Sequence, residues 1–202
     1  MVKYSFLGVD LQYDFSREGG EFYAPRKSVV FAREVLLPYL RKHGLKTAEI
    51  VSDYRQPRPG DARNICRPSE WGYESEVPDD ARIGDPWVKC MPSPIWIREN
   101  GGNPDAKPGI PYQDPAAFTG WLNRNVGGPK DIDSVILYGL TLDCCVLCTG
   151  QELAFRGYDV KVLYEGTDTR SGSREEKDHQ LSNPPIIFWM KPIHWKELVA
   201  SI

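Results

Sequence analysis

The segment Ser134–Cys148 joins a short apolar run to a cluster of cysteines and is the part of the chain best suited to chemistry. Residues 135–138 are apolar without interruption, which is typical of a strand buried on both faces. Residues 146–155 carry apolar side chains at helical spacing, and Gly157 follows where a helix would end. The pattern predicts a strand that delivers thiols to the first turn of a helix. Unpaired N–H groups and the helix dipole favour a thiolate and an oxyanion there.

Two other predicted strand ends carry a charged side chain. Residues 4–10 predict a strand that ends on Asp10, and the short apolar segment 88–91 contains Lys89. Open α/β folds keep their sites at the carboxyl edge of the sheet, so these groups and a thiol would meet there. The thiolate would attack a carbonyl, the carboxylate would move the proton, and the ammonium would balance charge. A cap or turn role for Asp10 explains its position equally well.

Histidine and cysteine usage narrows the choice of chemistry. All the histidines fall on predicted outer helices, which argues against a Cys–His protease: His43, His179 and His194. Cys145 and Cys148 form a C-x-x-C pair, but Val and Leu lie between them, and a thioredoxin-like site would also need its own element order around it, which disfavours a redox site. Cys66 and Cys90 add no second C-x-x-C or histidine pair, so no structural zinc site is expected.

Length and charge exclude several classes of protein. At 202 residues, the chain is expected to form a single domain over residues 1–202 with a full core. The net charge is −3 without a basic block, so neither nucleic acid nor a membrane is an expected partner. No apolar run approaches ~20 residues, and the N-terminus enters a predicted strand without a signal-peptide core. We therefore expect a cytoplasmic protein whose five cysteines stay thiols.

Strands alternate with helices along the chain, which predicts a three-layer α/β/α fold with a mostly parallel central sheet. Strands are predicted at residues 4–10, 47–52, 88–91, 135–138, 160–164 and 186–190. Helices are predicted at residues 28–43, 116–125, 146–155, 173–181 and 194–202. Prolines gather between residues 57 and 115. They predict a long loop over the site at 54–87 and a rim loop at 92–115.

Several motifs appear in a fixed order. Residues 10–15 (DLQYDF) match D-x-Q-x-D-F, residues 88–89 match a lysine motif, and residues 139–146 (GLTLDCCV) are similar to G-x-x-T-D-x-C-V. Residues 156–160 (RGYDV) match the G-[YF]-x-V that follows. Over nearly its whole length the chain thus resembles the isochorismatase-like cysteine hydrolases. That family includes nicotinamidases, N-carbamoylsarcosine amidases, ureide and biuret hydrolases, and isochorismatases. The resemblance implies the isochorismatase-like, Rossmann-like fold.

The resemblance also implies roles for individual residues. Asp10 corresponds to the general base and acid, Lys89 to the catalytic lysine, and Cys145 to the nucleophile, with the preceding Cys144 pointing elsewhere. A cis peptide is implied at Leu140–Thr141, and the N–H groups of Thr141 and Cys145 are the candidate oxyanion donors. Assembly as a dimer or tetramer is implied as well.

The chain departs from the nicotinamidases at their metal site. Those enzymes carry D-x-H and a further His, whereas this chain has Asp53-Tyr54-Arg55 and no later histidine in the loop. We therefore expect no metal, and no other cofactor. Arg55 is a candidate to replace the metal's charge and bind a substrate carboxylate or carbonyl, with a solvated surface arginine as the alternative. Loop tryptophans are candidate pocket walls, with simple loop packing as the alternative: Trp71, Trp87 and Trp96.

These observations predict a metal-independent cysteine amidohydrolase that acts on a small amide, carbamoyl or ureide substrate through a thioester at Cys145. Three alternatives remain open. One is isochorismatase-type vinyl ether hydrolysis, which needs the acid but not the thiol. Another is a nicotinamidase with an atypical metal site. The last is a non-catalytic binding protein on this fold.

Overall fold

The computed structural model describes residues 2–59 and 64–202 of the chain. Six strands form one sheet in the order β3-β2-β1-β6-β7-β8, and every neighbouring pair is parallel. The strands are β1 (Tyr4–Val9), β2 (Thr47–Ser52), β3 (Trp87–Lys89), β6 (Ser134–Leu140), β7 (Val160–Asp168) and β8 (Lys191–Ile193). The chain builds outward from β1 in one direction and from β6 in the other, so the crevice for a ligand lies beyond the ends of these two strands.

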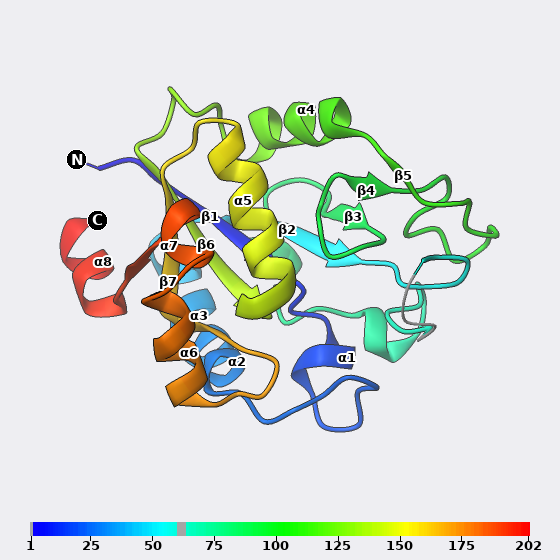
Figure 1. Ribbon diagram of the computed structural model, residues 1–202, viewed down its shortest axis with the longest axis horizontal. Coiled ribbons are helices and arrows are strands. Elements are labelled where there is room, and N and C mark those ends of the chain that lie inside the picture. The colour runs from blue at the N-terminus through cyan, green and yellow to red at the C-terminus, as the bar shows by residue number, and fades with distance from the viewer. Residues whose placement is uncertain (1, 60–63) are drawn as a thin grey trace.

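Helices cover both faces of the sheet (Figure 1). One face packs against α4 (Pro115–Asn125), α5 (Leu147–Phe155), α6 (Arg174–Leu181) and α7 (Ile186–Trp189). The other face packs against α2 (Lys27–Phe31), α3 (Leu37–Lys42) and α8 (Trp195–Ser201). Along β6, Val135 and Leu137 enter the first core while Ile136 and Tyr138 enter the second. This alternation explains why the strand is apolar throughout, and the predicted three-layer fold is confirmed.

Two predicted elements differ from the structure at the C-terminal end of the chain. Residues 186–190, predicted to be the last strand, form helix α7, and the last strand is β8. A short apolar run fits one turn of helix as well as a strand. Pro192 makes β8 hard to recognise, because proline is unusual in strands other than edge strands. Strand β7 also runs on to Asp168, through residues predicted to be a loop, because a register shift lets it stay paired with β6.

The predicted helix 28–43 is divided into two α-helices by a π-helical turn at Ala32–Leu36. Pro38 lies in the first turn of α3 and lacks a backbone N–H, so a regular α-helical hydrogen bond cannot form there. The helices predicted at 116–125, 173–181 and 194–202 are present as α4, α6 and α8.

Short elements occupy the two proline-rich regions. The loop 54–87 contains 3-10 turns at Trp71–Tyr73 and Asp79–Ala81, and residues 60–63 of this predicted loop lie outside the described residues. In the rim loop, β4 (Trp96–Ile97) pairs antiparallel with β5 (Tyr112–Gln113). A four-residue helix, α1 (Tyr13–Ser16), follows β1.

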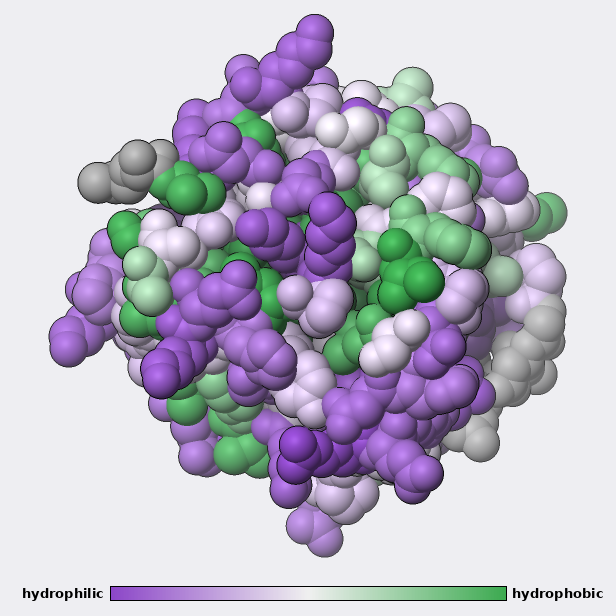
Figure 2. Space-filling model, turned by 60° about the vertical axis from the view of Figure 1, so that its left-hand side comes forward, coloured by the Kyte–Doolittle hydropathy of each residue, from purple (hydrophilic) through white to green (hydrophobic). Residues whose placement is uncertain are grey.

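Figure 2 shows one side of the molecule, on which hydrophobic residues form separate patches among hydrophilic ones. An exposed aromatic cluster lies at the end of α5 and on α7. Trp189 lies between Phe155 and Phe188, with ring centroids 4.9 and 6.4 Å away, and both phenylalanines are more than half exposed. Within the described residues, no helix has the length and apolar character needed to cross a bilayer.

Candidate active site

Three strand ends bring Asp10, Lys89 and Cys145 together. Asp10 follows β1 directly, Lys89 is the last residue of β3, and Cys145 lies in the turn after β6. The Lys89 Nζ atom lies 2.7 Å from Asp10 Oδ2 and 3.5 Å from Cys145 Sγ. All three side chains are buried. The predicted convergence of an acid, an amine and a thiol is present, while the role of each group in a reaction stays a prediction.

Ser52 and Tyr54, which the sequence analysis did not identify as site residues, complete this cluster. The Lys89 ammonium also donates to Ser52 Oγ at 2.7 Å and to Tyr54 OH at 2.9 Å, and Ser52 Oγ donates to Asp10 Oδ1 at 2.9 Å. Ser52 ends β2 and Tyr54 lies two residues further on. Side chains two residues apart along extended chain share a face, so the spacing of these hydroxyls was a usable signal.

The charge of Lys89 is fixed by its partners. Burial acts to lower the pKa of the Lys89 amine, but the Asp10 carboxylate and the other neighbouring groups outweigh it and raise the pKa well above its usual value. The amine is therefore an ammonium at neutral pH. Because the carboxylate of Asp10 accepts a hydrogen bond on each oxygen, it is held in one orientation.

Cys144 faces the same cavity as Cys145, which corrects the prediction that it points elsewhere. The two sulfur atoms lie 4.0 Å apart. Both residues belong to a π-helical turn at Leu142–Val146, where α-helix was predicted to begin later. This wider turn rotates successive residues by less than an α-helix does, so neighbouring side chains can share a face.

The two thiols influence each other's ionisation. The hydrogen bond from Cys145 lowers the pKa of the Cys144 thiol to about 7. The same contact and burial raise the pKa of the Cys145 thiol, whereas the Lys89 ammonium acts to lower it. The negative charge of the Cys144 thiolate opposes ionisation of Cys145. The contact of Lys89 with Cys145 Sγ draws that charge toward Cys145.

The turn before the cysteines has the geometry that the family resemblance implies. The Leu140–Thr141 peptide is cis, and Thr141 lines the cavity. Gly139 has a φ of 115°, and a Cβ atom there would collide with the carbonyl oxygen of Val9 in the neighbouring strand, so glycine is required. The oxyanion role of the Thr141 and Cys145 N–H groups stays a prediction.

The remaining polar residues of the DLQYDF motif support the site. Gln12 Oε1 accepts from the Ser52 N–H at 2.6 Å, and its Nε2 donates to the Ser52 carbonyl oxygen at 3.0 Å. Asp14 accepts from the N–H groups of Cys66 at 2.6 Å and Glu21 at 3.3 Å. These contacts join the end of β1 to β2 and to the loop that follows.

A cavity of about 280 Å³ opens onto Asp10, Cys144 and Cys145. Its walls are mainly apolar and include Phe15, Phe22, Ile65 and Leu140. Two arginines, Arg58 and Arg170, line it as well. A largely apolar pocket with a few convergent polar groups is the usual form of a small-molecule site.

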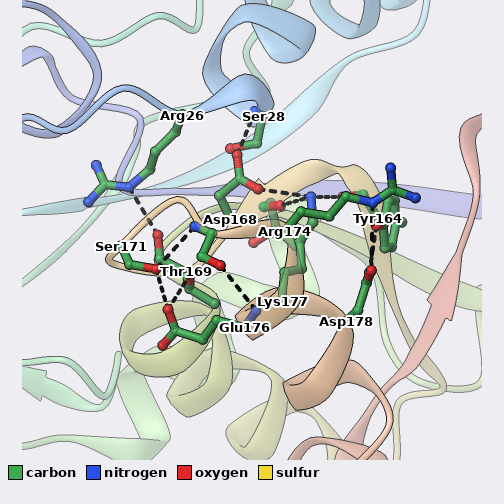
Figure 3. A network of polar contacts seen from close by, with 12 residues as sticks. Arg26, Ser28, Tyr164, Asp168, Thr169, Ser171, Arg174, Glu176, Lys177 and Asp178 are labelled. Atoms are coloured by element: carbon green, nitrogen blue, oxygen red, sulfur yellow. Dashed lines mark hydrogen bonds and ion pairs between the residues drawn. The ribbon is translucent and has the colours of Figure 1, made fainter.

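The loop that carries Arg170 is fixed by buried charged residues (Figure 3). Arg26 donates to the carbonyl oxygens of Thr169 at 3.1 Å and Arg170 at 2.8 Å. Lys177 Nζ lies 2.8 Å from Asp168 Oδ1. The Arg170 guanidinium lies 5.5 Å from the ring centroid of Phe22. The structure thus presents Arg170 to the cavity from a well-held backbone.

Arg55, for which a role in substrate binding is predicted, is not a lining residue of this cavity. Its guanidinium donates to both Asp53 oxygens, at 3.0 and 2.7 Å, and to the carbonyl oxygens of Asn100 and Ala106, both at 3.2 Å. These partners occupy four of its five N–H donors and fasten the rim loop. Its actual partners include a residue 51 positions away, which the sequence alone does not indicate.

The same ion pair bears on the metal site of the nicotinamidases. Asp53 is fully buried, both of its oxygens accept from Arg55, and Oδ2 also accepts from the Gly102 N–H at 3.0 Å. Over residues 2–59 and 64–202, no group of three or more His, Cys, Asp or Glu side chains is placed to hold a metal ion. The residues present therefore do not fit a zinc site of that kind.

The three tryptophans predicted as pocket walls are placed elsewhere than at this cavity. Trp71 is 47% exposed and packs on Tyr13, Trp87 packs on Phe118 and Trp121, and Trp96 lies in β4. None of the three lines the cavity. Its aromatic walls are instead Phe15, Phe22 and Tyr54. Phe15 ends the DLQYDF motif, so the motif indicated one cavity wall, whereas the composition of the loops did not.

Comparison with known proteins places the fold. No family model and no curated protein sequence matches the chain. An isochorismatase-like hydrolase from Alkaliphilus metalliredigens aligns at 16% identity over 99% of both chains, with a TM-score of 0.65. N-carbamoylsarcosine amidase from Thermoplasma acidophilum aligns at 21% identity over 96% of both chains, with a TM-score of 0.60. The zinc complex of Pyrococcus horikoshii pyrazinamidase aligns at 16% identity over 96% of this chain and 99% of that one, with a TM-score of 0.65. The chain therefore has the fold of the isochorismatase-like hydrolases.

Proposed function

We propose that the protein is a cysteine amidohydrolase that cleaves a C–N bond of a small amide, carbamoyl or ureide substrate without a metal. The observation that carries this proposal is the contact of one ammonium, Lys89, with both Asp10 Oδ2 and Cys145 Sγ beside a small cavity. Two of the structural relatives named above are amidases, which supports the same class of reaction.

The reaction would proceed through a covalent intermediate. The Cys145 thiolate attacks the substrate carbonyl carbon, and backbone N–H groups of the turn stabilise the oxyanion. Asp10 takes up the thiol proton and returns it to the departing nitrogen, so that ammonia or an amine leaves and a thioester remains. Asp10 then activates a water molecule, which releases the acid and restores the thiol. Lys89 holds Asp10 in place and balances the charge of the sulfur.

The two arginines of the cavity support a narrower substrate class. Guanidinium groups bind carboxylates through paired, charge-assisted hydrogen bonds. Arg58 and Arg170 stand against a mainly apolar wall, and the Arg170 backbone is held by Arg26. We therefore favour an amide or carbamoyl compound that also carries a carboxylate.

An ammonia-release screen tests the proposal. The panel would contain carbamoyl amino acids, maleamate, biuret and nicotinamide, with the wild-type protein and the Cys145→Ala and Cys148→Ala variants. We expect release from a carboxylate-bearing member, loss of all release in Cys145→Ala, and activity within a few-fold of wild type in Cys148→Ala. Ammonia release that persists in Cys145→Ala would overturn Cys145 as the nucleophile, and silence with an unreactive Cys145 would favour a binding protein.

Self-association is a further proposal, drawn from the family resemblance. The exposed cluster of Phe155, Phe188 and Trp189 is the surface that we would test first. Sedimentation velocity of wild-type protein and Phe188→Ser should show a dimer or tetramer that dissociates in the variant. A wild-type monomer at micromolar concentration would contradict the proposal.

A further inference from the structure

Tyr54 is held against the reacting sulfur by contacts on several sides. Its hydroxyl oxygen lies 2.9 Å from Lys89 Nζ and 3.5 Å from Cys145 Sγ. Its backbone N–H donates to the Ile65 carbonyl oxygen at 3.2 Å, and its ring makes an edge contact with Phe15 at 6.4 Å between centroids. The side chain is 6% exposed and lines the cavity. Its position is therefore part of the site rather than of the surface.

The direction of the hydrogen bonds follows from the chemistry of the partners. An ammonium has three protons and no acceptor, and those of Lys89 are directed at oxygens of Asp10, Ser52 and Tyr54. The tyrosine oxygen is therefore an acceptor toward Lys89, which leaves its own proton to point at Cys145 Sγ. The 3.5 Å contact between Lys89 and the sulfur is the longest of the four, and it adds the attraction of the ammonium for a thiolate.

The tyrosine stays protonated in this environment. Burial, and then the charge of the neighbouring Cys145, raise the pKa of the Tyr54 phenol well above its ordinary value. A neutral phenol beside an ammonium is a strengthened donor, because the charge of Lys89 polarises its O–H bond. Such a donor stabilises a thiolate more than a thiol.

We propose that Tyr54 is a further catalytic residue, whose hydroxyl donates a hydrogen bond to Cys145 Sγ and stabilises the thiolate that forms when Asp10 takes up the thiol proton. This inference rests on the proposed function, in which Cys145 is the nucleophile. The hydroxyl contacts the attacking atom directly, and it works together with Lys89, which supplies the charge. Tyr54→Phe removes this one oxygen and keeps the ring that forms the cavity wall.

The test measures the sulfur and needs no substrate. The rate of Cys145 alkylation by iodoacetamide is followed from pH 5 to about pH 10, with the modified sulfur assigned by fragmentation mass spectrometry. Wild type, Tyr54→Phe and Tyr158→Phe are compared. Tyr158→Phe also removes a hydrogen-bonded hydroxyl, which donates to the Gly127 carbonyl oxygen at 2.7 Å, but Tyr158 precedes β7 and so lies at the opposite edge of the sheet from Cys145, which follows β6. We expect the midpoint in Tyr54→Phe to rise by about one pH unit, with up to a tenfold slower reaction at pH 7, and no shift in Tyr158→Phe.

The outcomes separate this inference from the proposed function. A reactive Cys145 whose midpoint is the same in wild type and Tyr54→Phe would overturn the role of Tyr54 and leave the nucleophile in place. If the Tyr54 hydroxyl is only structural, Tyr54→Phe would lower the thermal midpoint of unfolding and slow alkylation equally at every pH. If iodoacetamide does not alkylate Cys145 of the wild-type protein at any pH, both proposals are overturned together.

Discussion

Lys89 Nζ lies 2.7 Å from Asp10 Oδ2, and neither side chain has more than 1% of its surface exposed. The pair reaches across β2, because Asp10 follows β1 and Lys89 ends β3. Two charges without water are stable only when they are paired and hydrogen-bonded, and here Ser52 contacts both partners. Stability and reactivity are therefore coupled at this pair.

Asp10→Asn should reduce both activity and stability. Loss of the acid–base group lowers kcat by roughly 10²–10⁴-fold. The buried Lys89 ammonium, left without a counter-charge, lowers the free energy of unfolding by about 3–5 kcal/mol. The double variant Asp10→Asn/Lys89→Met should regain part of the stability and none of the activity. Urea unfolding and steady-state kinetics measure the two effects, and a stable, active Asp10→Asn would contradict the assignment.

Cys144→Ala should keep activity but change its pH dependence. In wild type, contact with Cys144 helps to hold the pKa of the Cys145 thiol above its ordinary value, so kcat/KM should rise with pH as Cys145 ionises. The contact with Cys144 raises the pKa of Cys145, so its removal should move the acid limb to lower pH. The profile of kcat/KM against pH measures this shift. An upward shift, or loss of activity, would mean that Cys144 supports the nucleophile.

Arg170→Gln should weaken binding of a substrate that carries a carboxylate. The loss of charge-assisted hydrogen bonds raises KM by roughly 10–100-fold for such a substrate, and leaves a neutral amide of the same size unaffected. Arg174→Gln, on the exposed face of α6, is the matched control and should change neither value. Equal KM changes for charged and neutral substrates would show that Arg170 acts on the shape of the cavity instead.

Lys177→Met should destabilise the protein much more than an equivalent change at the surface. The variant leaves Asp168 buried without its cation, which costs about 3–5 kcal/mol of unfolding free energy. Arg174→Met breaks an exposed pair and should change stability by no more than about 0.5 kcal/mol. Chemical denaturation measures both values. Similar small effects in the two variants would show that the loop before α6 does not depend on this ion pair.

Chelation should leave the hydrolytic activity unchanged. Asp53 is neutralised by Arg55, so no open carboxylate is available for a divalent ion at that position. Activity after dialysis against EDTA, compared with activity after added Zn²⁺, measures the effect. A loss that zinc restores would show a metal site formed in some other way.

The sheet and the convergence of the chemical groups were predictable because buried strands leave a strong pattern. The apolar runs before Asp10 and before Cys145 identify β1 and β6, and adjacent strand ends place these two residues at the same edge. The strand–turn–helix order fixes Cys145 in the turn. Such inferences need only the chain's local pattern and the rules of parallel sheets.

The surroundings of the site were not predictable in the same way, because distant partners decide how a loop side chain is used. Arg55 binds Asp53 and the rim loop, and Trp87 turns into the core beneath α4. Arg170 reaches the cavity because β7 continues further than its apolar pattern indicates. Periodicity carries no information on these long-range contacts.

Gln12 extends the pairing of β1 and β2 past the last backbone bond of the sheet, because its carboxamide both gives and receives at the peptide groups of Ser52. A carboxylate of identical shape lacks the hydrogen that the Ser52 carbonyl requires, and would set two oxygens against each other. Gln12→Glu, which replaces this nitrogen by an oxygen, would therefore separate the ends of β1 and β2. The orientation of Asp10 thus depends on the Gln12 side-chain amide, which takes no part in the proposed reaction.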